Sequence, residues 1–215
     1  MLVPIVLVLG LVGTMLAWRL IGRGREVWRT LPPLLALFGT ASILLGRTLD
    51  APAPGGADVP GTGGILAVGL ASGGLFYLAT RGFVAIALHV PAFARQTKKA
   101  YAEAATADVR RELVLSLLLA VPGEELLWRG LAYRWGAEQF ASLAVAALVV
   151  WACYVLANLP SRSLPIIAGA VVGGALWGGL AWWSGGVLAP LASHILWTGS
   201  MLALPPRVAG AEGNG

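Results

Sequence analysis

The sequence is poor in cysteine and in charge. Only one of its 215 residues is a cysteine, Cys153, so a disulfide within the chain and a cysteine-based metal cluster are both excluded. Charged residues make up 12% of the chain and hydrophobic residues 58%, whereas a soluble domain has about 25% charged residues. This balance excludes a soluble enzyme with an ordinary wetted surface and a disordered regulator. It identifies an integral membrane protein.

The few charges are mostly basic, with a formal net charge of +5 and a pI of about 10.0. They gather in short segments between apolar stretches, which is the pattern of membrane topology and not of a nucleic-acid surface. We therefore expect membrane lipid as a partner and no nucleic acid.

Apolar stretches long enough to cross a bilayer recur along the whole chain. A spanning helix needs about 20 such residues, and helices satisfy their own backbone groups in lipid. The sequence predicts an all-α, polytopic transmembrane helical bundle of about seven spans, forming a single membrane domain over residues 1–215. The expected spans are 1–20, 31–46, a segment within 64–90, 112–133, 138–159, 164–183 and 186–204.

The basic residues predict how the bundle lies in the cell membrane. Positive residues collect in the loops near 23–29 and 95–111, and cytoplasmic loops carry an excess of Lys and Arg. This places the N-terminus outside and the C-terminus in the cytoplasm, with Arg134 as an exception. The segment 93–108 is expected to be a helix lying along the cytoplasmic face.

Three ionisable residues lie together inside the expected span 112–133, where each costs several kcal/mol in lipid. Glu125 and Arg129 are spaced i and i+4, which places them on one helix face as an ion pair. Glu124 is rotated by about 100° and has no partner on its own helix, so we expect it to be the free carboxylate. Pro122 and Gly123 just before it are expected to break or kink the helix and to favour a small polar cavity.

Two later spans carry further polar residues at one-turn spacing. His194 and Thr198 share a face of the last span, and Tyr154 and Asn158 share a face of the fifth. A carboxylate and a histidine around a water are sufficient for peptide-bond hydrolysis without a metal. Two carboxylates and one histidine make a poor zinc site, so we expect no metal and no cofactor.

The string Pro122-Gly123-Glu124-Glu125-Leu126-Leu127-Trp128-Arg129-Gly130 resembles the EExxxR signature of the CAAX protease and bacteriocin-processing (CPBP, formerly Abi) family. These are intramembrane glutamic proteases that include the eukaryotic Ras-converting enzyme. The resemblance covers about residues 112–204. It implies that Glu124 activates the attacking water, that Glu125 and Arg129 support it, and that His194 stabilises the oxyanion.

Two positions depart from the family pattern. Its FxxxH motif falls on Tyr154 to Asn158, and its HxxxN or HxxxD motif falls on His194 to Thr198. Asn158 can orient a water by hydrogen bonding but cannot exchange a proton near neutral pH. Thr198 keeps a hydroxyl donor in place of an amide, which is a milder change.

The sequence therefore predicts an intramembrane glutamic endopeptidase with the candidate site residues Glu124, Glu125, Arg129, Asn158, His194 and Thr198. Its substrates would be membrane-associated peptides or proteins. The resemblance allows prenylated CAAX-type proteins, bacteriocin or pheromone precursors, and C-terminal sorting anchors. The alternative is a catalytically impaired CPBP-fold protein that binds peptides or confers immunity. A structural charge network and a small transporter are weaker alternatives, and the oligomeric state stays open.

Three further groups of residues have an expected role. Arg81, inside the third span, is expected to pair with an acid on another helix, with a substrate carboxylate as the alternative. The glycines at 169, 173, 174 and 178 are expected to form rows for close helix packing. Tryptophans near span ends are expected to lie at the membrane interface; they are Trp18, Trp28, Trp135, Trp182 and Trp183.

Overall fold

The structure, a computed structural model, describes residues 2–46, 60–105 and 108–206. Within these ranges the chain is helical and holds no strand, so the all-α prediction is confirmed. The α-helices are α1 (Leu2–Ile21), α2 (Val27–Leu44), α3 (Thr62–Ala87), α4 (Pro91–Ala105), α5 (Val109–Leu115), α6 (Val121–Glu125), α7 (Tyr133–Gln139), α8 (Leu143–Asn158), α9 (Leu164–Ser184) and α10 (Leu188–Ala203). Two π-helical segments, Ser116–Ala120 and Leu126–Ala132, join α5, α6 and α7, and a 3₁₀ turn, Leu159–Ser161, follows α8.

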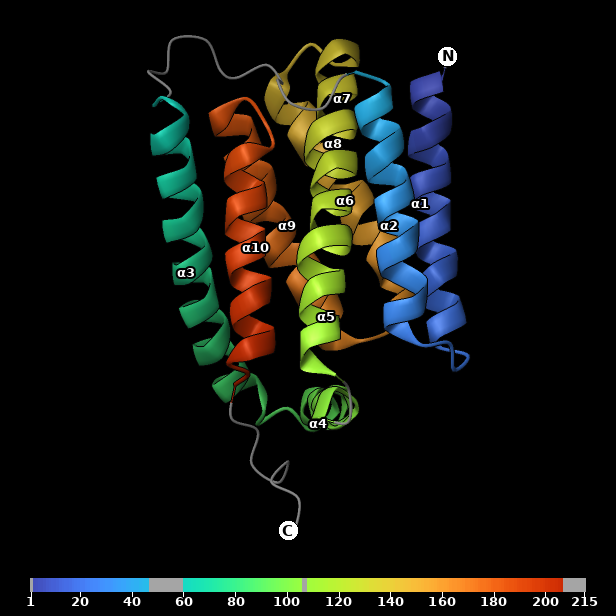
Figure 1. Cartoon of the computed structure of the whole chain (residues 1–215), viewed down its shortest axis with the longest axis vertical. Coiled ribbons are helices and arrows are strands. Elements are labelled where there is room, and N and C mark those ends of the chain that lie inside the picture. Colours follow the sequence, from blue (N-terminus) through green and yellow to red (C-terminus); the bar gives the residue numbers. More distant parts are fainter. Residues whose placement is uncertain (1, 47–59, 106–107, 207–215) are drawn as a thin grey trace.

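The long helices stand side by side as a bundle (Figure 1). Five of them, α1, α2, α3, α8 extended by its 3₁₀ turn, and α9, are long and apolar enough to cross a membrane. The two other expected spans correspond to the run from α5 to α7 and to the 16-residue α10, which stand in the same bundle. Large apolar side chains face outward on these helices, such as Leu78 (62% exposed) and Leu118 (68% exposed). Such a surface suits lipid and not water.

Helix α4 lies across one end of the bundle, at a steep angle to the other helices (Figure 1). Its one strongly buried aromatic side chain, Phe93, packs against Val84 and Ala87 of α3. Gln96 of α4 accepts a hydrogen bond from the backbone N–H of Leu164 at 2.7 Å, which caps the start of α9. The helix expected from the charged segment 93–108 is thus present as α4, and contacts with α3 and with the start of α9 hold it against the bundle.

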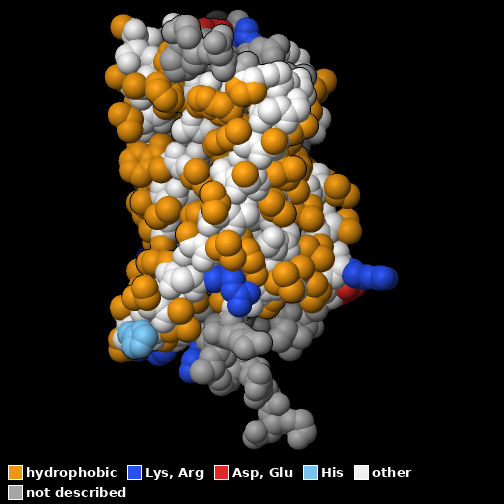
Figure 2. Space-filling view, turned by 90° about the vertical axis from the view of Figure 1, so that its left-hand side faces the viewer, with side chains coloured by type: hydrophobic (Ala, Val, Ile, Leu, Met, Phe, Trp, Pro, Cys, Tyr) orange, Lys and Arg blue, Asp and Glu red, His pale blue; other side chains and the backbone are white. Residues whose placement is uncertain are grey.

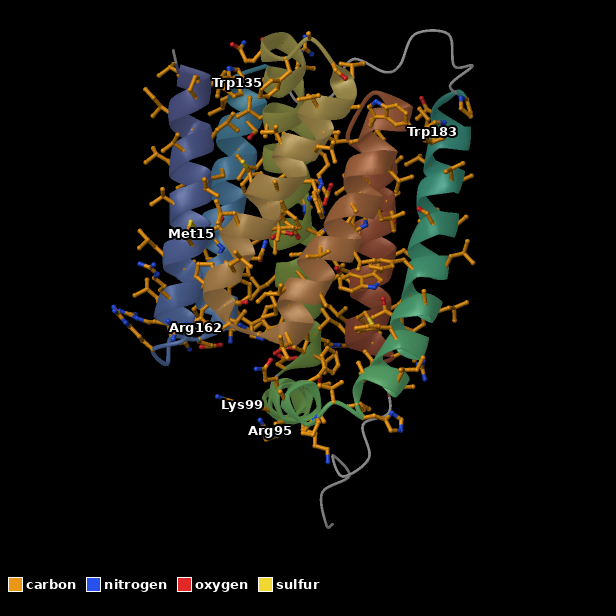
Figure 3. The ribbon with its side chains drawn as sticks, turned by 180° about the vertical axis from the view of Figure 1, so that it is seen from behind. Met15, Arg95, Lys99, Trp135, Arg162 and Trp183 are labelled. Carbon is orange, nitrogen blue, oxygen red and sulfur yellow. The ribbon has the colours of Figure 1, made fainter. Side chains whose placement is uncertain are left out.

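Charge and tryptophan gather at the two ends of the bundle. Arg95, Lys99 and Arg162 lie at the end crossed by α4, whereas Trp135 and Trp183 lie at the opposite end (Figure 3). The side of the bundle shown in Figure 2 is largely hydrophobic between these ends, with basic side chains low on it. This is the distribution that the loop charges predict for a bundle embedded in a membrane.

Small residues bring pairs of helix backbones into direct contact. A Cβ added to Gly73 of α3 would lie 2.4 Å from the carbonyl oxygen of Ser193, so α3 and α10 touch through their backbones. A Cβ on Gly123 of α6 would lie 2.3 Å from the carbonyl oxygen of Leu35 in α2. Each contact excludes any larger residue, and together they set how closely α2 and α10 approach their neighbours.

The glycine row expected on α9 is only half right. Cβ atoms built on Gly173 and Gly174 would crowd Trp177 and Tyr154, at 2.9 and 2.8 Å. Cβ atoms on Gly169 and Gly178 would meet nothing within 4 Å, so the packing role predicted for these two glycines is wrong. Gly178 lies one turn beyond Gly174 on the same face of α9 and borders a small cavity, so no packed side chain lies beside it.

Candidate active site

The helix that carries the acidic motif continues through Pro122 and Gly123, so of the break or kink expected there the break is wrong and the kink stays a prediction. A proline lacks the N–H that an α-helix needs, and the chain accommodates this with a wider turn just before it. The N–H of Val121 donates five residues back, to the carbonyl of Ser116. A second π-helical segment follows the two glutamates, and π-turns inside α-helices are frequent at functional sites. Gly123 serves close packing against α2 and does not end the helix.

Glu125 is the centre of a buried network of charged groups. Its side chain is fully buried, and its Oε1 accepts from Arg129 Nη1 at 3.2 Å. The i, i+4 ion pair predicted from the spacing is therefore confirmed. The same Oε1 lies 2.7 Å from His194 Nδ1 on α10. One carboxylate oxygen thus links the motif helix to the histidine helix.

Arg129 has partners on every side. Its Nη2 donates to the carbonyl oxygen of Gly174 at 3.4 Å, and its guanidinium lies 4.4 Å from the ring centroid of Tyr154 and 5.5 Å from that of Trp177. The side chain is 3% exposed. A buried cation with a carboxylate, a carbonyl and two aromatic faces is well compensated in a low-dielectric interior.

His194 is held by a hydrogen bond at Nδ1 and by stacking of its ring. Its ring stacks on Trp177, with centroids 3.6 Å apart and planes 17° from parallel. An ionised carboxylate only accepts hydrogen bonds, so with Glu125 ionised in its pair with Arg129, the Nδ1 of His194 carries the hydrogen. Nε2 is then the nitrogen available to a reacting group.

Glu124 differs from its neighbour in burial and in partners. It is partly buried, and its Oε2 accepts one hydrogen bond, from the hydroxyl of Tyr154 at 3.3 Å. It also interacts electrostatically with His194 and Arg129. The two adjacent glutamates are thus separated into a buried, paired carboxylate and a more accessible one.

The remaining two predicted site residues lie in different surroundings. Asn158 is buried beneath Tyr154, where its Nδ2 donates to the Tyr154 carbonyl at 2.9 Å and its Oδ1 accepts from Trp18 Nε1 at 2.9 Å. Thr198 lies one turn beyond His194, and in the described part of the chain it makes no hydrogen bond with the side chains of Glu124, Glu125 or His194. The structure therefore brings five of the six candidates into one connected set and leaves Thr198 beside it.

A small cavity borders this set. It has a volume of about 10 Å³ and is lined in part by Arg129, Tyr154 and Gly174, which is about the space that one water needs. A larger apolar groove of about 200 Å³ runs along α1 and α8 on the other side of Trp128. The ring of Trp128 packs edge-on against Tyr154, with centroids 5.8 Å apart, and it lines both spaces.

Several contacts of the site were missed from the sequence. Trp18, whose interfacial position stays a prediction, also donates its indole N–H to Asn158. Trp177 is the stacking partner of His194. Neither contact has a local signal, because each joins two different helices.

Arg81 lies outside the site, and the acid partner expected for it is wrong. Its Nη1 donates to the hydroxyl of Tyr77 at 2.7 Å and to the carbonyl oxygen of Leu204 at 3.3 Å. These neutral partners, one on α3 itself and one at the end of α10, satisfy the guanidinium.

No group of three or more His, Cys, Asp or Glu side chains that could hold a metal ion occurs within residues 2–46, 60–105 and 108–206.

Part of the chain matches the model of a known protein family. Residues 108–200 match the family model described as type II CAAX prenyl endopeptidase Rce1-like. Neither a curated protein nor a solved structure matches the chain. The matched segment contains the acidic motif, Asn158, Trp177 and His194. This match supports the resemblance of residues 108–200 to the CAAX protease family.

Proposed function

We propose that the protein is an intramembrane glutamic endopeptidase that hydrolyses peptide bonds in membrane-associated substrates. The proposal rests on one observation: the two adjacent glutamates differ in burial and in hydrogen-bond partners. Glu125 is fully buried between Arg129 and His194, whereas Glu124 is partly buried and, among the described residues, accepts a hydrogen bond from the Tyr154 hydroxyl alone. A purely structural charge network uses Glu125 and has no need of Glu124.

Glu124 is the general base in this proposal. It removes a proton from a water, and the oxygen of that water attacks the carbonyl carbon of the scissile peptide bond. The tetrahedral intermediate then collapses as the C–N bond breaks, and the leaving nitrogen takes up a proton. A positioned carboxylate that relays this proton contributes about 10²–10⁴-fold to the rate. Tyr154 holds the carboxylate in place through its hydroxyl.

His194 has the geometry of a histidine oriented by a carboxylate. Glu125 accepts from Nδ1, so neutral His194 presents Nε2 as an acceptor. To stabilise an oxyanion, Nε2 must carry a hydrogen, which requires the imidazolium form. The Glu125 carboxylate at Nδ1 and the stacked ring of Trp177, with centroids 3.6 Å apart, fix the orientation of the imidazole. In this proposal His194 donates from Nε2, in the imidazolium form, to the oxyanion or to the leaving nitrogen.

Asn158 and Thr198 have smaller roles in this proposal. Asn158 orients water or substrate by hydrogen bonding and transfers no proton. Thr198 lies on the same helix as His194, and its hydroxyl is a second donor to substrate. The chemistry therefore depends on Glu124 and His194.

The substrate meets this site from within or beside the bilayer. We propose a cell-membrane location with the end carrying α4, Arg95 and Arg162 in the cytoplasm, because basic residues concentrate there. Prenylated CAAX-type proteins, bacteriocin or pheromone precursors and C-terminal sorting anchors are the candidate substrate classes. All three place a peptide bond close to a lipid anchor or an apolar segment.

The proposal is tested with purified protein in liposomes and a panel of three synthetic peptides, one for each substrate class. Wild type is expected to cleave at least one peptide and, in H₂¹⁸O, to place one ¹⁸O in the new C-terminal carboxylate. Glu124→Gln keeps the shape of the side chain and is expected to lower the rate at least 100-fold. Glu138→Gln, on the exposed end of the same helical run, is the matched control and is expected to retain cleavage. Equal cleavage by Glu124→Gln and wild type would refute the proposal.

The alternative function is a peptide-binding or immunity protein with the same fold. One observation favours it: Asn158 stands where the family pattern has histidine, and its amide is already bonded to Trp18 and Tyr154. Asn158→His distinguishes the two. It is expected to raise the cleavage rate of an impaired enzyme, whereas a binder gains no cleavage.

A further inference from the structure

The first helix contributes a side chain to the site although it lies outside the segment that matches the family model. Trp18 of α1 donates its indole N–H to Oδ1 of Asn158 at 2.9 Å, across 140 positions of the chain. The matched segment begins at residue 108. The contact therefore joins an unmatched part of the protein to a site residue.

The partners of Asn158 fix which way its amide points. An indole N–H only donates and a backbone carbonyl only accepts. Oδ1 must therefore face Trp18, and Nδ2 must face the carbonyl oxygen of Tyr154 at 2.9 Å. The flipped amide would set donor against donor and acceptor against acceptor. Because Asn158 is 4% exposed, bulk water does not reach both partners, so the flip would leave them unsatisfied.

The ring of Trp18 is itself held in place. It packs against the buried cluster of Ala17, Leu31 and Leu35, which lies between α1 and α2. The hydrogen bond to Asn158 thus comes from an aromatic side chain that is held by the packing of α1 on α2. Such packing makes its N–H a preorganised donor.

We propose that Trp18 is a positioning residue that turns Asn158 into a fixed hydrogen-bond donor of the site. With Oδ1 bonded to Trp18 and one Nδ2 hydrogen bonded to Tyr154, the second Nδ2 hydrogen is left to hold a water or a substrate oxygen. The pair Trp18–Asn158 therefore orients an oxygen without proton transfer, at the position where the family pattern has histidine. This inference rests on the proposed endopeptidase function.

The next residue in the same chain of contacts is Tyr154. Its carbonyl receives Asn158, and its hydroxyl donates to Glu124 at 3.3 Å. A change in the orientation of Asn158 thus reaches the general base through one residue. The expected consequence of losing the Trp18 bond is a slower chemical step, with substrate binding unchanged.

The test compares Trp18→Phe, which removes the N–H and keeps most of the ring, with Trp182→Phe, whose ring is 38% exposed on α9. The peptide of the three-member panel that wild type cleaves is the probe. Trp18→Phe leaves a buried acceptor unsatisfied, and we expect kcat to fall about tenfold with KM unchanged. Trp182→Phe is expected to keep wild-type kcat.

A double-mutant cycle separates positioning from general destabilisation. In an Asn158→Leu background, Trp18→Phe is expected to have no further effect on kcat, because the acceptor is already absent. The same cycle on thermal unfolding tests the bond itself without any cleavage. Asn158→Asp keeps the acceptor for Trp18 but loses the donor, so its kcat should fall as far as that of Asn158→Leu.

Each outcome is decisive. An unchanged kcat in Trp18→Phe, or an equal fall in both backgrounds, overturns the positioning role while wild-type cleavage leaves the endopeptidase function standing. A wild-type protein that cleaves no peptide of the panel overturns the endopeptidase function and this inference with it. Should Trp18→Phe fail to fold, Asn158→Asp decides: wild-type kcat in that variant overturns the inference.

Discussion

Removing the cation of the buried network is the sharpest test of how the site is held together. Arg129→Met keeps the length and apolar stem of the side chain but leaves the fully buried Glu125 carboxylate with His194 alone. Breaking a buried ion pair by removing one partner costs about 3–5 kcal/mol, because the remaining charge is uncompensated. The second donor, His194 at 2.7 Å, softens this loss, so we expect about 3 kcal/mol.

The chain offers a matched control on the same helical run. Arg134 and Glu138 are also spaced i and i+4, but their closest atoms are 3.8 Å apart and their side chains are 34% and 40% exposed. An exposed pair of this kind contributes about 0.3–0.5 kcal/mol. Arg134→Met is therefore expected to change stability by less than one sixth of the loss in Arg129→Met.

The assay is thermal unfolding of each variant in detergent micelles, followed by tryptophan fluorescence. For a chain of this length, about 3 kcal/mol corresponds to a Tm lowered by about 6–12 °C, and the control should stay within about 2 °C of wild type. Adding Glu125→Gln to Arg129→Met removes the stranded charge and should recover at least half of the loss. Equal shifts in Arg129→Met and Arg134→Met would refute the reasoning.

Two further predictions concern close packing and the general base. Gly123→Ala is expected to lower the Tm strongly, because its Cβ would lie 2.3 Å from the Leu35 carbonyl oxygen. Gly179→Ala is the control: its Cβ would meet nothing within 4 Å, so it should be neutral or stabilising by up to about 1 kcal/mol. A loss of stability in Gly179→Ala as large as in Gly123→Ala would contradict the contact. Tyr154→Phe removes the one hydrogen bond that the Glu124 side chain accepts within the described residues, and we expect kcat to fall about tenfold on the cleaved peptide of the panel. An unchanged kcat would show that the hydroxyl does not position the base.

The sequence predicted the helical bundle well, because the tendency of an apolar stretch to cross a membrane as a helix depends on that stretch alone. Each apolar stretch of about 20 residues is an independent unit that satisfies its own backbone. The helices α1 to α3 and α8 to α10 accordingly lie where the sequence places them, with ends displaced by a few residues. The Glu125–Arg129 pair was predictable for the same reason, since both residues belong to one helical turn.

Local rules failed where a second helix decides the outcome. Pro122 was expected to break or kink its helix, but the helical run is continuous, with Gly123 packed on Leu35 and a π-turn that accommodates the missing N–H. Arg81 was expected to find an acid, but its guanidinium donates to Tyr77, one turn away on α3, and to Leu204 at the end of α10. In both cases a residue outside the helix itself, Leu35 or Leu204, takes part in the outcome.

By itself, therefore, the sequence determined the membrane bundle, the buried ion pair and the residues that can do acid–base chemistry. It did so through composition and one-turn spacing, which depend on neighbours in the chain. Only the tertiary structure decided that His194 binds Glu125 and not Glu124, that Trp177 stacks on it, and that Trp18 orients Asn158. Those contacts join helices more than 15 positions apart in the chain, and they exist only once small residues have brought the helices together.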